Sequence, residues 1–280
     1  MIASNEILTG EKIQLLAQIY LGNRYDFGFN PVTSEQKEKH VLIDEIVEEF
    51  ENPSLVFCYS DKIVILSSKI HFFKNNFVLI THNGDQDIED CVEIQKILDC
   101  SKLSKWYAQN LVFYHEKLHY LPIGMANSMW SHGNLDVFEN PDFYNSLSRK
   151  NKKTYFQFSL GTSRSKRERC FNVFNGKIEF LNIISSTHNF WRLKDYEFCI
   201  CPEGNGVDTH RLWECLYLKT VPIVINSPFI ETLKKYNSKL PFVVLNSWED
   251  YDEGKLDYSK YSFDDIDISF EYFVNKILSE

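Results

Sequence analysis

Short runs of apolar, β-favouring residues alternate with stretches of helical periodicity along the first half of the chain. Such runs, bounded by polar turns, are typical of buried strands. The predicted strands cover residues 54–59, 77–81, 111–114 and 118–123, and the predicted helices cover residues 62–70 and 87–98. Because the strands alternate with helices, the pattern predicts βαβ units and a parallel sheet.

The second half of the chain repeats this pattern. Its predicted strands cover residues 155–158, 198–201, 221–225 and 242–245, and a last helix is predicted at residues 268–278. The polar stretch 146–153 interrupts the apolar pattern and is typical of a linker. We therefore expect an α/β fold of two Rossmann-like domains, residues 1–148 and 149–280, that face each other across a cleft. Ligands of such sheets bind just after the carboxyl ends of the strands.

Composition narrows the functional classes. The 280 residues are 44% hydrophobic with a net charge of −9, which argues against a broad surface for nucleic acid or acidic lipid. No apolar run reaches the roughly 18 residues of a membrane span, and the first residues lack a secretory pattern. We expect a cytoplasmic protein without membrane insertion. The seven cysteines lie mostly in apolar runs and are predicted to be reduced core residues.

A glycine-containing loop follows the predicted strand 198–201. Gly204 and Gly206 allow the backbone to approach a ligand closely. Asp208 or Thr209 is expected to cap a helix that starts nearby, and the amides of that helix start favour an anion such as a pyrophosphate. The loop is therefore a candidate phosphate site.

One face of the predicted helix is charged. His210, Arg211 and Glu214 share an arc of about 100° at helical spacing. Arg211 suits a phosphate and Glu214 suits the two hydroxyls of a ribose, which together describe a nucleoside diphosphate site. The alternative is an ordinary Arg–Glu pair on a solvated helix face.

The run PEGNGVDTHRLWECLYLKTVPIV resembles the donor-site signature of the exostosin-like glycosyltransferases. It departs from that signature at Cys215, where Ala is usual, and at Lys219 and Thr220, where a Gly commonly precedes the apolar residue and Pro. The strong resemblance covers about thirty residues. It implies that Arg211 contacts the diphosphate and Glu214 the ribose.

The resemblance also implies that Asp208, Thr209 and His210 lie at the sugar-phosphate end of the donor, next to the Gly204 and Gly206 loop. It further implies a GT-B fold and an inverting enzyme that needs no divalent metal or other cofactor. The substrates implied are a UDP-sugar, with UDP-xylose as one candidate, and a hydroxyl of an oligosaccharide or other glycan. Without a leader or anchor, the chain is more similar to cytoplasmic enzymes such as those of large DNA viruses, which would place it in the host cytoplasm.

Residues 158–169 concentrate positive charge after the predicted strand 155–158. Gly161 and Thr162 lie in the predicted loop, and Arg164 and Arg167 follow them. In the resemblance this loop faces the donor phosphates, where cations stabilise the leaving nucleoside diphosphate without a metal. The alternative is a basic, solvated helix start.

Candidate catalytic residues follow the predicted strand 77–81. Inverting transfer requires a base for the acceptor hydroxyl, and His82, Asp85 and Asp87 lie directly after the strand. Asp85 is the first choice, and an Asn-Gly-Asp turn is the structural alternative. Asp85 and Asp87 also form a D-x-D pair, so a metal-dependent transferase of the GT-A type is a competing interpretation.

The loop 121–133 supplies candidate acceptor contacts. Asn127, Trp130 and His132 lie in a stretch of small and polar residues, and Trp130 suits stacking on a sugar. A capped surface loop with one buried aromatic side chain is the alternative. A sugar-binding module without catalytic activity is a further alternative for the whole chain.

Overall fold

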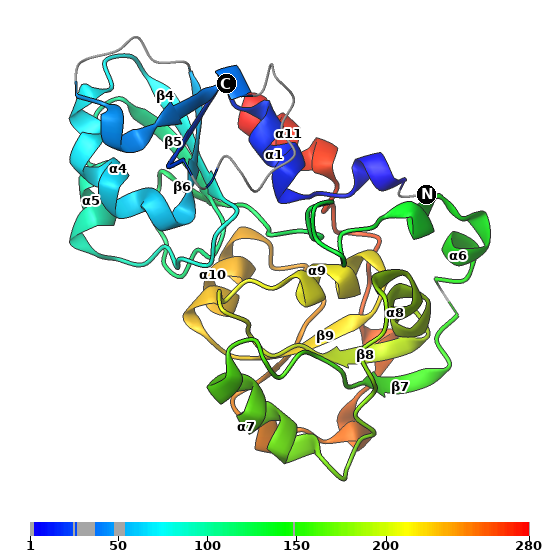
Figure 1. The fold of residues 1–280 in the computed structure, drawn as a ribbon. Coiled ribbons are helices and arrows are strands. Elements are labelled where there is room, and N and C mark those ends of the chain that lie inside the picture. The colour runs from blue at the N-terminus through cyan, green and yellow to red at the C-terminus, as the bar shows by residue number, and fades with distance from the viewer. Residues whose placement is uncertain (1–2, 25, 27–36, 48–53, 148, 280) are drawn as a thin grey trace.

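The computed structural model describes residues 3–24, 26, 37–47, 54–147 and 149–279, and these residues form two parallel sheets (Figure 1). The first sheet has six strands in the order β2-β1-β3-β4-β5-β6. They are β1 (Ile19–Gly22), β2 (His40–Leu42), β3 (Leu55–Tyr59), β4 (Phe77–His82), β5 (Leu103–Ala108) and β6 (Leu118–Tyr120). All five residues of β3 are buried, as expected for a central strand covered on both faces.

The second sheet has four parallel strands in the order β10-β9-β8-β7. They are β7 (Lys152–Tyr155), β8 (Tyr196–Ile200), β9 (Val221–Ile225) and β10 (Val243–Leu245). The expected α/β class with parallel sheets is therefore confirmed. The division at residue 148 stays a prediction, and that residue lies outside the described part of the chain.

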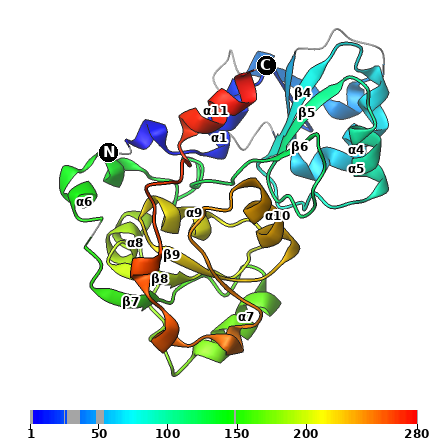
Figure 2. The same ribbon diagram turned by 180° about the vertical axis from the view of Figure 1, so that it is seen from behind.

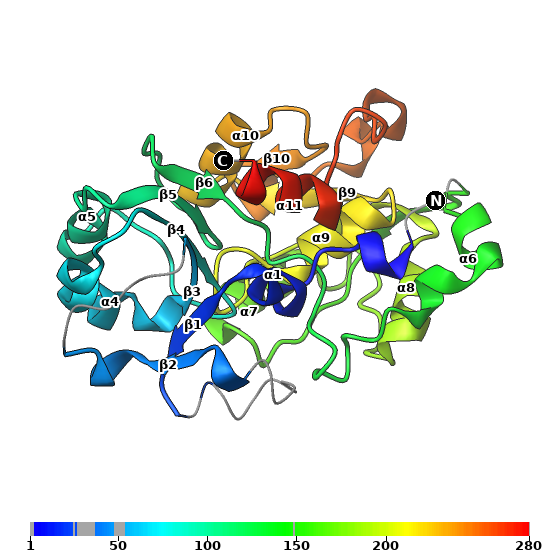
Figure 3. The ribbon, with the colours of Figure 1, turned by 90° about the horizontal axis from the view of Figure 1, so that it is seen from above.

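Helices cover both faces of each sheet (Figures 1 and 3). They are α1 (Gly10–Leu16), α4 (Ile63–Lys69), α5 (Val92–Leu98), α6 (Pro141–Asn145), α7 (Arg164–Phe174), α8 (Ser186–Leu193), α9 (His210–Tyr217), α10 (Pro228–Tyr236) and α11 (Phe270–Leu278). Short 3-10 turns lie at Ser4–Glu6, Ile43–Glu45, Ser60–Lys62, Ile70–Phe72, Asp136–Glu139, Trp248–Asp250, Glu253–Lys255 and Tyr258–Lys260. None of the described helices is long and apolar enough to pass through a membrane.

The last helix lies against the first sheet (Figure 2). Phe273 and Ile277 of α11 belong to the same buried cluster as Phe57 of β3. The Tyr107 hydroxyl of β5 donates to the Lys276 carbonyl at 2.6 Å. In addition, the Tyr217 hydroxyl of α9 accepts from the Leu8 amide at 3.0 Å and donates to the Ile268 carbonyl at 2.7 Å. The two halves of the chain are thus joined by buried contacts.

Two predicted strands differ from the structure, one in each sheet. Residues 111–114 form no strand, because β5 occupies the position beside β4 and Leu111 makes only an isolated bridge to Ile88. Strand β5 was missed because Ser104 and Lys105 interrupt its apolar pattern. The predicted strand 155–158 lies instead at Lys152–Tyr155, so Gln157 and Phe158 belong to the loop after β7.

Candidate functional site

The loop after β8 is held against the first half of the chain. The Asp208 amide donates to the Asn110 side-chain oxygen at 2.9 Å, and a Cβ on Gly206 would lie 2.9 Å from that same side chain. Gly206 is therefore required by packing against Asn110. Thr209 is the N-cap of α9, but its side chain does not make the expected capping hydrogen bond.

Asp208 is a buried connecting residue. Its Oδ2 accepts from the Ile123 amide at 2.7 Å, and its Oδ1 accepts from the Trp213 indole at 2.7 Å. Burial raises the pKa of Asp208 to about 7, against the opposing effect of these hydrogen bonds. Both carboxylate oxygens already accept hydrogen bonds from the protein. Asp208 therefore holds the wall of the site in place and is less available to a ligand.

Arg211 and Glu214 lie side by side on α9. Arg211 Nε donates to Glu214 Oε2 at 2.7 Å, while its Nη1 and Nη2 donate to the carbonyl and side-chain oxygens of Gln157 at 2.8 and 3.1 Å. The guanidinium also lies 5.5 Å from the ring centre of Tyr155. Arg211 is therefore anchored from three directions, and both side chains still line the cavity described below. Gln157, missed in the sequence, fixes Arg211 in place.

The structure separates the two arginines of the basic segment. Arg167 donates to the Glu203 and Ser159 carbonyls, each at 2.9 Å, and lines the same cavity as Arg211. Burial, and then the charge of Arg211, lowers the pKa of Arg167. Arg164 instead pairs with Glu168 at 2.5 Å with its side chain 80% exposed, and its role as a donor contact is not supported. Gly161, also exposed, does not line this cavity, whereas Thr162 does.

A cavity of about 560 Å³ opens between the ends of β7 and β8. We call it the β7–β8 cavity, and its wall includes Thr162, Arg167, Gly204, Gly206, Asp208, Thr209, His210, Arg211 and Glu214. Residues 183–186 and Asn189 close its other side. The cavity lies at the carboxyl end of this parallel sheet, which is the end at which ligands of such sheets bind.

A second cavity of about 660 Å³ lies at the end of β4. We call it the β4 cavity, and its wall includes His82, Asn83, Gly84, Asp85, Asn127, Trp130 and His132. The two cavities have six lining residues in common, which are Asp85, Ile123, His132, Thr162, Asn205 and His210. They are therefore adjoining parts of one larger space.

The three candidate bases have different surroundings. Asp85 is exposed and lines both cavities. His82 is buried, with Nε2 2.9 Å from the Pro122 carbonyl and Nδ1 3.1 Å from the Asn83 side chain, and burial lowers its pKa. Asp87 lines a separate small cavity with Ser60, and burial raises its pKa. Since Asp85 and Asp87 line different cavities, the D-x-D pair does not converge on one ion.

The candidate acceptor residues gather in the β4 cavity. Trp130 is 50% exposed, and its ring stacks on His132 with centroids 6.3 Å apart. His132 in turn lies edge-on to His210 at 6.0 Å. The Asn127 side chain is already hydrogen-bonded within the protein. It accepts from the Glu11 amide at 2.9 Å and donates to Asn83 at 3.2 Å. The exposed aromatic face of Trp130 is thus the best-placed surface for a sugar.

Three cysteines lie behind the charged face of α9. The sulfur atoms of Cys199, Cys201 and Cys215 are buried within 4.8 Å of one another. Within the described residues they are the one group of three or more that meets the geometry of a metal site. Burial is the largest influence on Cys201 and Cys215 and raises both pKa values, and all three side chains belong to the apolar core.

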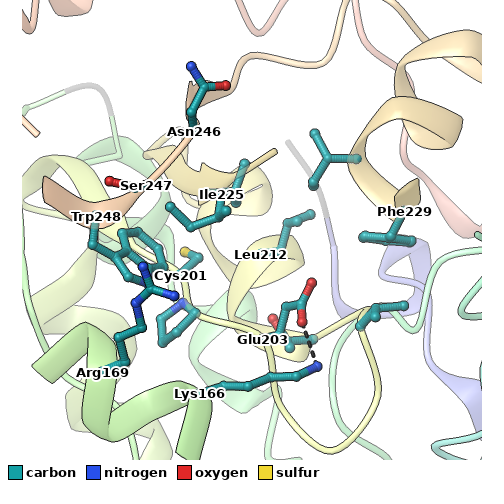
Figure 4. A pocket seen from close by; sticks show the side chains of 15 residues that line it. Lys166, Arg169, Cys201, Glu203, Leu212, Ile225, Phe229, Asn246, Ser247 and Trp248 are labelled. Atoms are coloured by element: carbon teal, nitrogen blue, oxygen red, sulfur yellow. Dashed lines mark hydrogen bonds and ion pairs between the residues drawn. The ribbon is translucent and has the colours of Figure 1, made fainter. Parts of the chain in front are cut away.

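A third cavity, of about 240 Å³, lies at the ends of β9 and β10 (Figure 4). Its floor is mainly apolar and includes Leu212, Phe229 and Trp248. At its mouth Lys166 pairs with Glu203 at 2.6 Å, and Arg169 also lines the cavity. Thr209 lines both this cavity and the β7–β8 cavity.

Comparison with known proteins leaves the site to be interpreted from its own geometry. No protein-family model matches this chain, and no curated protein sequence matches it.

Proposed function

We propose that this chain is a glycosyltransferase of the GT-B type that moves a sugar from a UDP-sugar to a glycan hydroxyl. The observation that supports this proposal best is the adjoining pair of cavities. One is walled by Arg167, Arg211 and Glu214 at the carboxyl end of a parallel sheet, and the other by an exposed tryptophan. A two-substrate transfer reaction requires two such compartments that meet.

The donor is proposed to occupy the β7–β8 cavity. Its diphosphate would lie near Arg167 and the start of α9, where backbone amides and a guanidinium both favour an anion. Its ribose would lie at Glu214, whose Oε2 already accepts from Arg211 and whose Oε1 can accept from a hydroxyl. Arg211 would hold Glu214 in place and add positive charge.

The acceptor is proposed to enter through the β4 cavity, with Trp130 stacking on a sugar ring. Transfer with inversion then takes place where the cavities adjoin. The two arginines stabilise the departing diphosphate, so this mechanism does not require a metal ion. The metal-dependent alternative needs Asp85 and Asp87 at one ion, which their separate cavities do not support.

Calorimetric titration with UDP in EDTA tests the donor site. We expect the wild type to bind UDP. Glu214→Ala loses a charged hydrogen bond to the ribose, worth about 1.5 to 3 kcal/mol, and Arg211→Ala loses the group that holds Glu214 in place and adds positive charge. Each variant should weaken binding at least about tenfold. The matched controls are Arg164→Ala and Glu168→Ala, which remove an exposed ion pair away from the cavities. The controls should bind UDP within about twofold of wild type.

Thermal melting separates lost binding from lost folding, since Arg211 also anchors Gln157. Failure of the folded wild type to bind UDP, or binding that requires Mn²⁺, would contradict the proposed site. UDP binding without transfer from any UDP-sugar to a panel of glycans would instead support the non-catalytic sugar-binding module.

A further inference from the structure

We infer that His210 is the general base that takes the proton from the acceptor hydroxyl. The inference rests on the proposed transferase function and identifies a residue that the sequence favours only as a donor contact. His210 is the first residue of α9, and it lines both the β7–β8 cavity and the β4 cavity. In a single displacement the base must reach the acceptor hydroxyl at the point where acceptor and donor meet. His210 lies at that point, because it lines both cavities.

One hydrogen bond determines which ring nitrogen is available. His210 Nδ1 lies 2.9 Å from the carbonyl oxygen of Gly124. Because a carbonyl only accepts, Nδ1 carries the hydrogen, and the lone pair of the neutral ring is on Nε2. Nε2 has no hydrogen-bond partner in the described part of the chain. It is therefore the nitrogen available to a ligand of the two cavities.

The groups around His210 suit a base that becomes charged only briefly. Burial lowers its pKa and His132 acts in the same direction, so the neutral ring predominates near pH 7. The Gly124 carbonyl and the carboxylates of Glu214 and Asp85 oppose that effect and stabilise the imidazolium once it forms. His82 is a further titratable neighbour; it is buried, and burial and then His210 lower its pKa.

The rival bases are less well placed. Both ring nitrogens of His82 are within hydrogen-bond distance of protein oxygens, and Asp87 lines a different cavity. Asp85 lines both cavities but is exposed. We assign Asp85 to stabilising the charged ring of His210.

The reaction balances without another reagent. The acceptor oxygen attacks the anomeric carbon and forms the new C–O bond while its proton passes to His210 Nε2. The bond from that carbon to the diphosphate oxygen breaks, and its electron pair leaves with UDP. The imidazolium then returns its proton to solvent.

The test measures release of UDP from UDP-xylose and UDP-glucose, with water or a glycan as acceptor, from about pH 5 to about pH 9. His210→Gln keeps an amide that can donate to the Gly124 carbonyl but has no basic nitrogen. We expect it to bind UDP within about twofold of wild type, to lose at least about 100-fold in kcat, and to lose the acid limb of the kcat/KM profile. The matched control is His71→Gln, at an exposed histidine that lines neither cavity, and it should keep that limb and the wild-type kcat. Asp85→Asn should keep the limb but move it to lower pH, because Asp85 raises the pKa of His210. Imidazole should partly restore His210→Ala.

Four outcomes would contradict the assignment of His210, the transferase function, or both. If His210→Gln turns over within about fivefold of wild type, or keeps the acid limb, His210 is not the base. If His210→Gln loses as much affinity for UDP as it loses in kcat, His210 is a binding residue. Transfer with retention would reject the base alone and leave the donor site standing. A wild type that binds UDP but releases none from either UDP-sugar would reject both the base and the transferase function.

Discussion

The loop after β8 and the loop after β4 look alike in sequence, since each has glycine and a carboxylate in the loop that follows a buried strand. Their carboxylates nevertheless have opposite surroundings. Asp208 is 3% exposed and accepts two hydrogen bonds at 2.7 Å, whereas Asp85 is exposed. The wall of the β7–β8 cavity is thus built from charges that the protein already holds in place. The facing wall leaves Asp85, Trp130 and His132 open to solvent.

The two walls are proposed to bind the two substrates differently. Arg167, Arg211 and Glu214 keep their positions through protein contacts, so the proposed donor would meet a wall that is already ordered. On the opposite wall, exposed aromatic side chains can adapt to sugars of different shape.

The largest effect is expected at Asp208. Asp208→Ala leaves the buried Ile123 amide and Trp213 indole without their acceptor, and each such loss costs about 1 to 3 kcal/mol. We expect the free energy of unfolding to fall by about 3 kcal/mol, measured by urea denaturation. Asp85→Ala is the matched control and should change it by less than about 0.5 kcal/mol. Equal effects of the two variants would remove the contrast between the loops.

The pH dependence of the free energy of unfolding tests the burial of Asp208. The pKa of Asp208 is raised to about 7 in the folded protein, so its contribution to stability is fully present below the unfolded pKa and is lost as the pH rises toward 7. On going from about pH 8 to about pH 5, the wild type should gain about 2 to 3 kcal/mol more than Asp208→Asn, which cannot titrate. Parallel pH profiles of the two proteins would show that Asp208 does not titrate in this range.

Arg167 and Arg164 provide a comparison within one helix. Arg167→Ala should weaken UDP binding about tenfold and reduce its salt dependence, because Arg167 lines the β7–β8 cavity next to Arg211. Arg164→Ala should leave affinity within about twofold, because its side chain is 80% exposed and paired with Glu168. Calorimetry at two salt concentrations measures both quantities. The reverse order would place the diphosphate on the outer face of α7.

Trp130 should give the smallest effect, confined to the acceptor. Trp130→Ala removes the exposed ring of the β4 cavity, and we expect the KM for a glycan acceptor to rise about fivefold, or about 1 kcal/mol. Affinity for UDP should not change. An equal effect on UDP and acceptor would mean that Trp130 supports the whole site structurally.

The order of β8, α9 and β9 was predictable because all its signals lie within one continuous segment. The observed helix starts at His210, close to the expected position, and β9 covers the expected residues 221–225. Strand β5 was not predictable from apolar runs, because Ser104 and Lys105 break its pattern. Its place in the sheet comes from pairing with β4 and β6, and a local sequence pattern does not show such pairing.

The individual roles of the site residues depend on contacts distant in sequence. Asp208 meets the Ile123 amide, 85 positions earlier in the chain, so its buried connecting role has no local signature. Arg164 and Arg167 are equivalent as charges and differ only in the face of α7 on which they lie. His210 likewise depends on the Gly124 carbonyl to leave Nε2 available.

The central claim is that a nucleotide binds in the β7–β8 cavity, and a crystal structure of the protein soaked with UDP tests it most directly. We predict a ribose hydroxyl within hydrogen-bond distance of Glu214 and a diphosphate beside Arg167 and the Thr209 amide, without a metal ion. UDP bound instead in the apolar cavity of Figure 4, or held by a metal ion at Asp85, would contradict it.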